Sequence, residues 1–290
     1  MAAHVFEPVF SREDLIEICK KANFGEARKS GLNMARYRKA FSEQLSGMNF
    51  TCKFNNGISL SFRFGDVHTL EWSEDGSAWY EEYYEALQSS AGNVIGMLFT
   101  RRHTLPYEGA FMVFDMDSGF ATWARIVLGS AFDEKFAAPT FYFGEMEGVG
   151  SHEGMRPHFS TGLMGTSIDW QYNEEFSIRH SYVSPVLTIS PHMPKEKLNE
   201  DGEDERFIGR LFLRARNAKI RDDLYLTSFT EPGNCCAVLL IDLKLVHDIG
   251  CFYGITYQGE LHGETITAMG GIGSDGLKPD VGYARPKAEF

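Results

Sequence analysis

The chain has 290 residues, of which 43% are hydrophobic and 13% aromatic, and its formal net charge is −12 at pH 7. It is long enough for one large domain or two ordinary ones, and its negative charge disfavours nucleic acid and anionic membranes as partners. No apolar run reaches the about 18 residues of a membrane-spanning helix, and the N-terminus lacks a secretory signal pattern. Five cysteines without a C-x-x-C pair are typical of reduced thiols, so we expect a cytoplasmic protein.

The N-terminal segment, residues 1–47, carries the helical pattern of the chain. Ser11 is followed three positions later by Asp14, a capping-box spacing that predicts the start of a helix. A second helix is expected over residues 32–45, ended by Gly47.

From residue 48 onward, apolar and polar residues alternate as they do in half-buried strands. Asn56 and Gly57 form a hairpin signal, because both residues accept positive φ. Strands at short, even spacing indicate an antiparallel meander, which tends to close into a barrel. Further strands are expected over residues 80–87, 94–101, 110–115, 121–128, 207–217, 223–231, 237–243, 251–257 and 264–269.

The strand-rich region divides into two units. A glycine-rich stretch over residues 129–160 indicates the junction, so the first unit is 48–150 and the second is 151–290 with a Gly/Pro-rich tail. Within the second unit, the acidic and proline-containing stretch 189–204 predicts an exposed loop. The predicted fold is mostly β, with antiparallel β-barrel units in tandem after a short helical segment.

A tryptophan and a tyrosine recur at the same spacing in the two units. Trp72 precedes Tyr84, and Trp170 precedes Tyr182 by the same number of residues. A shared order of such patterns implies a shared structural unit.

Each unit also contains an apolar run that ends in Phe-Thr. Aligning these two runs places Phe99 over Phe229 and Arg101 over Glu231. Residues two apart lie on one face of a strand, so each ionisable residue shares the face of its phenylalanine. If the aromatic faces point inward, each barrel receives a charged group, which is costly unless it is paired or functional. A structural ion pair at the barrel rim is the alternative.

Short motifs stand out in both halves of the chain. They are Leu45–Phe50, Asn56-Gly57, Phe62–Phe64, Leu70–Trp72, Tyr84–Ala86, Asp169-Trp170, His180–Tyr182, Asp222–Tyr225, Phe229–Glu231 and Val246–Gly250. Together they resemble the motifs of MoaF-like proteins over residues 45–270. The resemblance implies a calycin, or lipocalin-like, barrel that is distantly similar to phenolic acid decarboxylases.

Four residues are candidates for catalysis. His180 and Tyr182 lie on one face of a predicted strand, where both can transfer protons, and Glu231 is a candidate acid or base. Arg101 is expected to orient an anionic or carbonyl group of the substrate. Each residue alone is more often packing than catalysis. The apolar walls of the substrate site are expected from Trp72, Tyr84, Phe99, Trp170, Tyr225, Phe229 and Tyr253.

The sequence predicts neither a metal nor an organic cofactor. The nine histidines are scattered, and the one GxGxxG pattern, Gly271–Gly276, is not followed by a helical pattern. We therefore expect a cofactor-independent enzyme that acts on an apolar aromatic or polyene molecule by general acid/base catalysis. Isomerisation, cyclisation, decarboxylation or elimination would suit such a site. A non-catalytic carrier of the same ligand is the alternative, and the sequence leaves open whether the chain forms a homodimer.

Overall fold

The computed structural model describes residues 10–22, 35–129, 137–174, 176–194, 210–231, 234–255 and 259–272, and these are mostly β-strand. They form one helix, α1 (Arg12–Lys21), and seventeen strands. The strands are β1 (Asn49–Phe54), β2 (Ser59–Phe64), β3 (Thr69–Glu74), β4 (Tyr80–Gln88), β5 (Val94–Arg101), β6 (Glu108–Asp115), β7 (Phe120–Val127), β8 (Ala138–Met146), β9 (His158–Phe159), β10 (Ser167–Gln171), β11 (Phe176–Ser184), β12 (Leu187–Pro194), β13 (Arg210–Arg221), β14 (Leu224–Glu231), β15 (Cys235–Asp242), β16 (His247–Ile255) and β17 (Leu261–Ile272).

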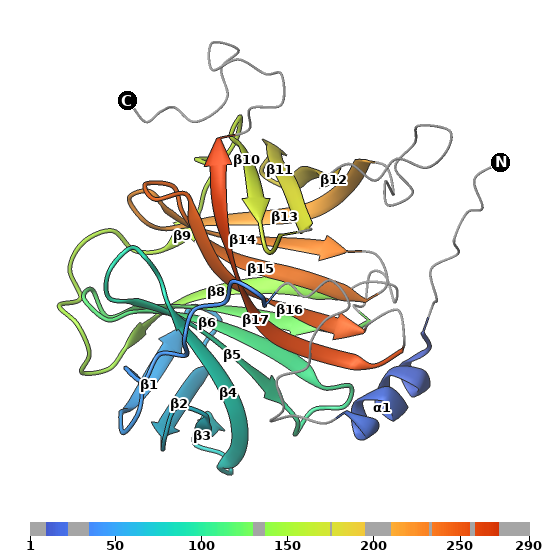
Figure 1. The fold of residues 1–290 in the computed structure, drawn as a ribbon. Coiled ribbons are helices and arrows are strands. Elements are labelled where there is room, and N and C mark those ends of the chain that lie inside the picture. The colour runs from blue at the N-terminus through green and yellow to red at the C-terminus, as the bar shows by residue number, and fades with distance from the viewer. Residues whose placement is uncertain are drawn as a thin grey trace.

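Strands β1 to β8 form the first barrel, in which each strand pairs with the next along the chain (Figure 1). The barrel closes where β1 pairs with β8, with Cys52 opposite Met146. Every second residue of β1 and β2 is buried, so one face of these strands fills the barrel and the other lies toward solvent. The alternation in the sequence therefore reflects the inside and outside of a closed barrel.

Strands β10 to β17 form the second barrel, drawn in yellow to red in Figure 1. It closes where β10 pairs with β17, with Trp170 opposite Gly270, and the pairing of β12 with β13 completes the ring. The short strand β9 pairs with β13 at Ala218 and Lys219, past the residues of β13 that pair with β12. The prediction of antiparallel barrels in tandem is confirmed.

The helical prediction is half right. Helix α1 begins at the predicted capping box, in which Ser11 and Asp14 bond each other's backbone N–H groups. The second helix, over residues 32–45, is wrong for the described part, because residues 35–48 contain turns and irregular backbone and no helix. This segment lies on the first barrel, where the Ser42 N–H donates to the Ala86 carbonyl at 2.8 Å and Phe41 packs edge-on against His68. These tertiary contacts outweigh the local helical preference.

Two expected loops contain strands. β8, with nine residues, lies within the stretch 129–160 that was expected as the junction, because its pairing with β1 and β7 closes the first barrel. β12 occupies the first part of the expected loop 189–204, and residues 195–204 lie outside the described residues. Pro191 is tolerated there because it stands at the last pair of the β12–β13 ladder, opposite Arg210.

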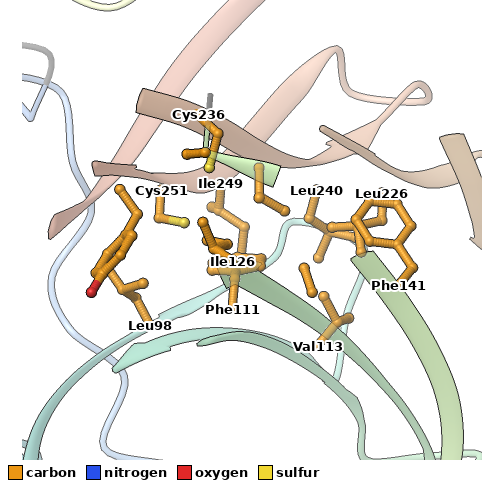
Figure 2. Close-up of a cluster of buried hydrophobic side chains, with 14 of the residues drawn as sticks. Leu98, Phe111, Val113, Ile126, Phe141, Leu226, Cys236, Leu240, Ile249 and Cys251 are labelled. Carbon is orange, nitrogen blue, oxygen red and sulfur yellow. The ribbon is translucent and has the colours of Figure 1, made fainter. Parts of the chain in front are cut away.

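The two barrels share an apolar seam built from the outer faces of β5 to β8 and β14 to β17. Figure 2 shows side chains from both barrels pointing toward one another across this seam. Because β5 and β6 also face their own barrel interior, every residue of these two strands is buried. The labelled members are Leu98, Phe111, Val113, Ile126 and Phe141 of the first barrel, and Leu226, Cys236, Leu240, Ile249 and Cys251 of the second.

Two polar contacts join the barrels at one end of the seam, and each uses an aspartate from a different barrel. Arg221, at the end of β13, donates through Nε to Asp115 Oδ2 of the first barrel at 2.5 Å. Ser90, just beyond β4, donates to Asp242 Oδ2 of the second barrel at 2.8 Å. Each barrel therefore reaches across to an aspartate of the other.

The internal repeat is correct in one part and wrong in the other. β5 and β14 are each the fifth strand of their barrel, so the alignment of Phe99 with Phe229 joins equivalent strands. Trp72 lies on the third strand of its barrel, whereas Trp170 lies on the first. The tryptophan–tyrosine echo therefore does not mark equivalent positions.

Candidate functional site

The structure divides the predicted site residues between the barrels. Arg101 lies inside the first barrel, whereas His180 and Tyr182 lie inside the second, so it does not bring Arg101 together with the candidate acid/base residues. The predicted aromatic walls divide in the same way, with Trp72, Tyr84 and Phe99 in the first interior and Trp170, Tyr225 and Phe229 in the second.

The interior of the first barrel is filled by aromatic rings. Phe50 and Phe114 meet edge-to-face with ring centroids 5.2 Å apart, and Trp72 lies 5.5 Å from Phe99. The Tyr84 hydroxyl donates a hydrogen bond to the Asp66 carbonyl at 2.7 Å. Such mutual packing is that of a hydrophobic core over most of this interior.

Arg101 enters this interior as part of a charged cluster. Its Nη1 donates to Glu108 Oε2 at 2.6 Å, and its Nη2 bonds Glu74. Glu108 also accepts two bonds from Arg125, at 2.8 and 2.6 Å. Burial lowers the pKa of Arg101, and the two glutamates oppose that shift. The structure thus contains the ion pairs that were the alternative to a catalytic role.

The interior of the second barrel carries polar groups beside its aromatic rings. His180 and Tyr182 share the inward face of β11, as predicted. The His180 ring lies 4.5 Å from the Phe229 ring, and the Tyr182 ring lies 6.2 Å from it. Tyr225 and Trp170 line the same interior.

A buried carboxyl that sequence reasoning missed lies in this interior. Asp248 on β16 is fully buried, accepts the Ala268 N–H at Oδ1 at 2.6 Å, and accepts the Tyr172 hydroxyl at Oδ2 at 3.3 Å. Burial raises the pKa of Asp248 to about 7, against the smaller lowering by these two donors. The group therefore exchanges a proton near neutral pH, as a general base or acid must.

The sequence shows an aspartate at the start of an apolar strand, but the burial of Asp248 shows only in the structure. Ile249 and Cys251 are buried in the seam, so both faces of β16 are covered, and the opposite face points into the barrel. An aspartate in such an apolar strand has no exposed face to occupy. A carboxyl forced inside in this way is a candidate site residue.

Several buried polar atoms of this barrel have no close hydrogen-bond partner among the described residues. They include the Tyr182 hydroxyl, which lies near the Trp170 indole N–H and the Asp248 carboxyl, and the hydroxyls of Thr188 and Ser190 on β12. Burial, and after it the charge of Asp248, raises the pKa of Tyr182 well above its ordinary value. Tyr182 is therefore a neutral hydroxyl that can donate to an oxygen of a bound molecule.

A second buried carboxyl faces the same interior. Glu264 on β17 is only 2% exposed, and its Oε1 lies 3.1 Å from Nε2 of His262. It shares the inward face of β17 with Ile266 and Ala268. Ala268 bonds Asp248, so the two carboxyls lie at different depths of one barrel.

Two predicted site residues fall elsewhere. Glu231 ends β14 opposite Cys235, and its side chain lies outside the described residues. Tyr253 is wrong as a ligand wall, because the alternation along β16 places it in the seam between the barrels. Its ring lies against Gly109, where an added Cβ would come within 2.7 Å of the ring.

Asp248 makes the stability of the protein depend on pH. Its pKa is raised from 3.8 to about 7 on folding, so the folded state binds the extra proton between these values and loses stability as pH rises through them. Asp248→Asn removes this loss. We expect the stability advantage of the variant to grow by up to about 4 kcal/mol between pH 4 and pH 8, measured by urea unfolding of both proteins. A constant difference across that range would show that Asp248 is not buried as described.

Within the described part of the chain, no group of three or more His, Cys, Asp or Glu side chains is placed to hold a metal ion. The same residues include no helix long and apolar enough to cross a membrane. Comparison with protein-family models found no match, and comparison with curated proteins found none either. The resemblance to MoaF-like proteins therefore stays a prediction.

Proposed function

We propose that the second barrel binds an apolar small molecule that carries a carbonyl oxygen, and moves a proton on it without a cofactor. Asp248 carries this proposal, because it is a fully buried carboxyl with a pKa of about 7. A group with this pKa is present in both protonation states near neutral pH, which is what a proton-transfer catalyst requires.

Each polar group has a role in this chemistry. Asp248 removes a proton from the carbon next to the carbonyl, and Tyr172, which bonds its Oδ2, holds the carboxyl in place. The Tyr182 hydroxyl and the Trp170 indole N–H donate to the oxygen on which negative charge develops. In a β,γ-unsaturated ketone, Asp248 then returns the proton at the γ-carbon while the double bond moves into conjugation with the carbonyl, so that atoms and charge balance.

The walls of the barrel favour a flat, apolar substrate. Phe229 and Tyr225 stand on β14, and Trp170 stands on β10, so aromatic surfaces face the interior from different strands. An aromatic or polyene ketone combines such a body with one acceptor oxygen. His180, whose ring packs on Phe229, is a second group that can exchange a proton with this substrate.

A carrier that binds the same ligand unchanged is the alternative. It is favoured by the same aromatic walls, since binding needs only contact and a few donors. The two functions differ in whether Asp248 exchanges a proton with the ligand.

Deuterium exchange separates the two functions. Benzylideneacetone and related apolar ketones are incubated with the protein in heavy water, and binding is followed by quenching of Trp170 fluorescence with Trp170→Phe as reference. An enzyme incorporates deuterium next to the carbonyl faster than buffer does, and Asp248→Asn abolishes the difference. The exposed Asp222→Asn is the matched control. A ketone that binds but exchanges no faster than in buffer would establish the carrier.

A further inference from the structure

The first barrel holds a buried arginine whose hydrogen-bonding edge is half used. The Arg101 side chain is 2% exposed, and its Nη1 donates to Glu108 at 2.6 Å. On the other edge of the guanidinium, Nη2 bonds Glu74, whereas Nε has no hydrogen-bond partner in the described residues. One N–H donor is therefore left beside one carboxylate oxygen.

Other arginines of this chain use the same edge completely. Nε and Nη2 point in the same direction and match the two oxygens of a carboxylate. Arg125 bonds Glu108 through both atoms at 2.8 and 2.6 Å, and Arg179 bonds Asp169 through both at 2.6 and 2.8 Å. Glu74 reaches Arg101 through a single oxygen, so a better-placed carboxylate would gain a bond that Glu74 does not make.

Glu74 is also the replaceable partner of Arg101. Its side chain is 29% exposed, whereas that of Glu108 is 9% exposed and is held by Arg125 as well. Glu74 is the last residue of β3, at the mouth of the barrel. A carboxylate that enters from solvent would meet Glu74 first, and the displaced side chain would turn to water.

The surroundings of Arg101 suit an aromatic ligand. Its Cζ lies 5.1 Å from the Trp72 ring and 5.2 Å from the Trp123 ring, and both indole N–H groups are buried without a partner. Nearer the surface, Tyr80 stacks on His103 with centroids 4.6 Å apart. Flat apolar surfaces and two unpaired indole N–H donors thus lie around one guanidinium, whose own Nε is unpaired as well.

We propose that the mouth of the first barrel binds the carboxylate of a small organic acid with a flat apolar body. Arg101 holds both oxygens of that carboxylate, and Glu74 is an internal competitor for the same edge. This site lies in a different barrel from Asp248 and does not depend on the function proposed there.

Benzoate is the probe that tests this site. Glu74→Gln removes the competing charge, so we expect it to bind benzoate about 5- to 50-fold more tightly than the unchanged protein in calorimetric titration. Glu71→Gln, on the exposed side of the same strand, is the matched control and should leave the affinity unchanged. Loss of folding weakens binding, so it cannot imitate a gain of affinity.

Two further measurements locate the benzoate. Arg101→Lys keeps the charge but lacks the paired donors, so affinity should fall at least about tenfold, and benzamide should bind far more weakly than benzoate. The chain has four tryptophans, and their indole N–H signals can be assigned by Trp→Phe variants. Benzoate should shift the Trp72 and Trp123 signals and leave that of Trp170 in place. No tighter binding by Glu74→Gln, or a shift confined to Trp170, would overturn the proposal.

Discussion

Asp248→Asn is expected to lower turnover of a carbonyl substrate by roughly 10²–10⁴-fold, the usual worth of a general base. The amide keeps the size of the carboxyl and can still accept the Ala268 N–H, while its NH2 group donates to the Tyr172 hydroxyl instead of accepting from it. The substitution therefore changes the proton chemistry more than the shape of the barrel. Ligand affinity, measured by quenching of Trp170, should change much less, because aromatic contacts supply most of the binding.

The pH dependence of that turnover gives an independent measurement. Asp248 acts as a base when deprotonated, so the rate should rise with pH through about 7 and level off above it. Tyr182→Phe should retain this profile while lowering the rate by roughly 10²-fold, since it removes an oxyanion donor and not the base. If Asp248→Asn retains full activity, proton transfer belongs to another residue and Asp248 is structural.

Phe111→Ala is expected to destabilise the protein by about 3–5 kcal/mol, the usual cost of truncating a buried phenylalanine. Phe111 is 1% exposed and lies at the centre of the seam between the barrels (Figure 2). Its loss removes contacts from both barrels at once, and the rigid barrel walls cannot collapse to fill the space. Chemical denaturation followed by circular dichroism would give the free energy of unfolding.

Phe159→Ala is the control for that measurement. Phe159 is 53% exposed and stacks on Phe141 at the outer side of the first barrel. We expect it to cost less than about 1 kcal/mol. A similarly small cost for Phe111→Ala would mean that the seam contributes little to stability.

Local pattern was sufficient to predict most of the strands and the tandem barrels, but not β8 and β12 or how the two barrels pack together. Period-two alternation located β1 and β2, and the capping box located α1, because these signals act between near neighbours in the chain. The helix predicted over residues 32–45 does not form in the described part, because this segment bonds the first barrel instead, through Ser42 and Ala86. A contact between residues so far apart in the chain leaves no local sequence pattern. The sequence likewise did not predict that the two barrels pack together through their outer faces.

The candidate site was predicted in part for the same reason. The shared face of His180 and Tyr182 follows from strand geometry alone, and the structure places both inside the second barrel. Whether the inward face of β16 carries Asp248 or Tyr253 depends on which side meets the other barrel, since both sides are buried. The sequence could show that one face is apolar, but not that the seam covers it.

The matched contacts of Arg221 with Asp115 and of Ser90 with Asp242 have a consequence for how this chain can be divided. A fragment that contains only one barrel would lack the partner residue of each contact. It would also expose the apolar side chains of the seam to water. Such a wall promotes association with any similar surface. The tandem arrangement is therefore one physical unit, and a cut at residues 147–157 would separate two strand systems that depend on each other for solubility.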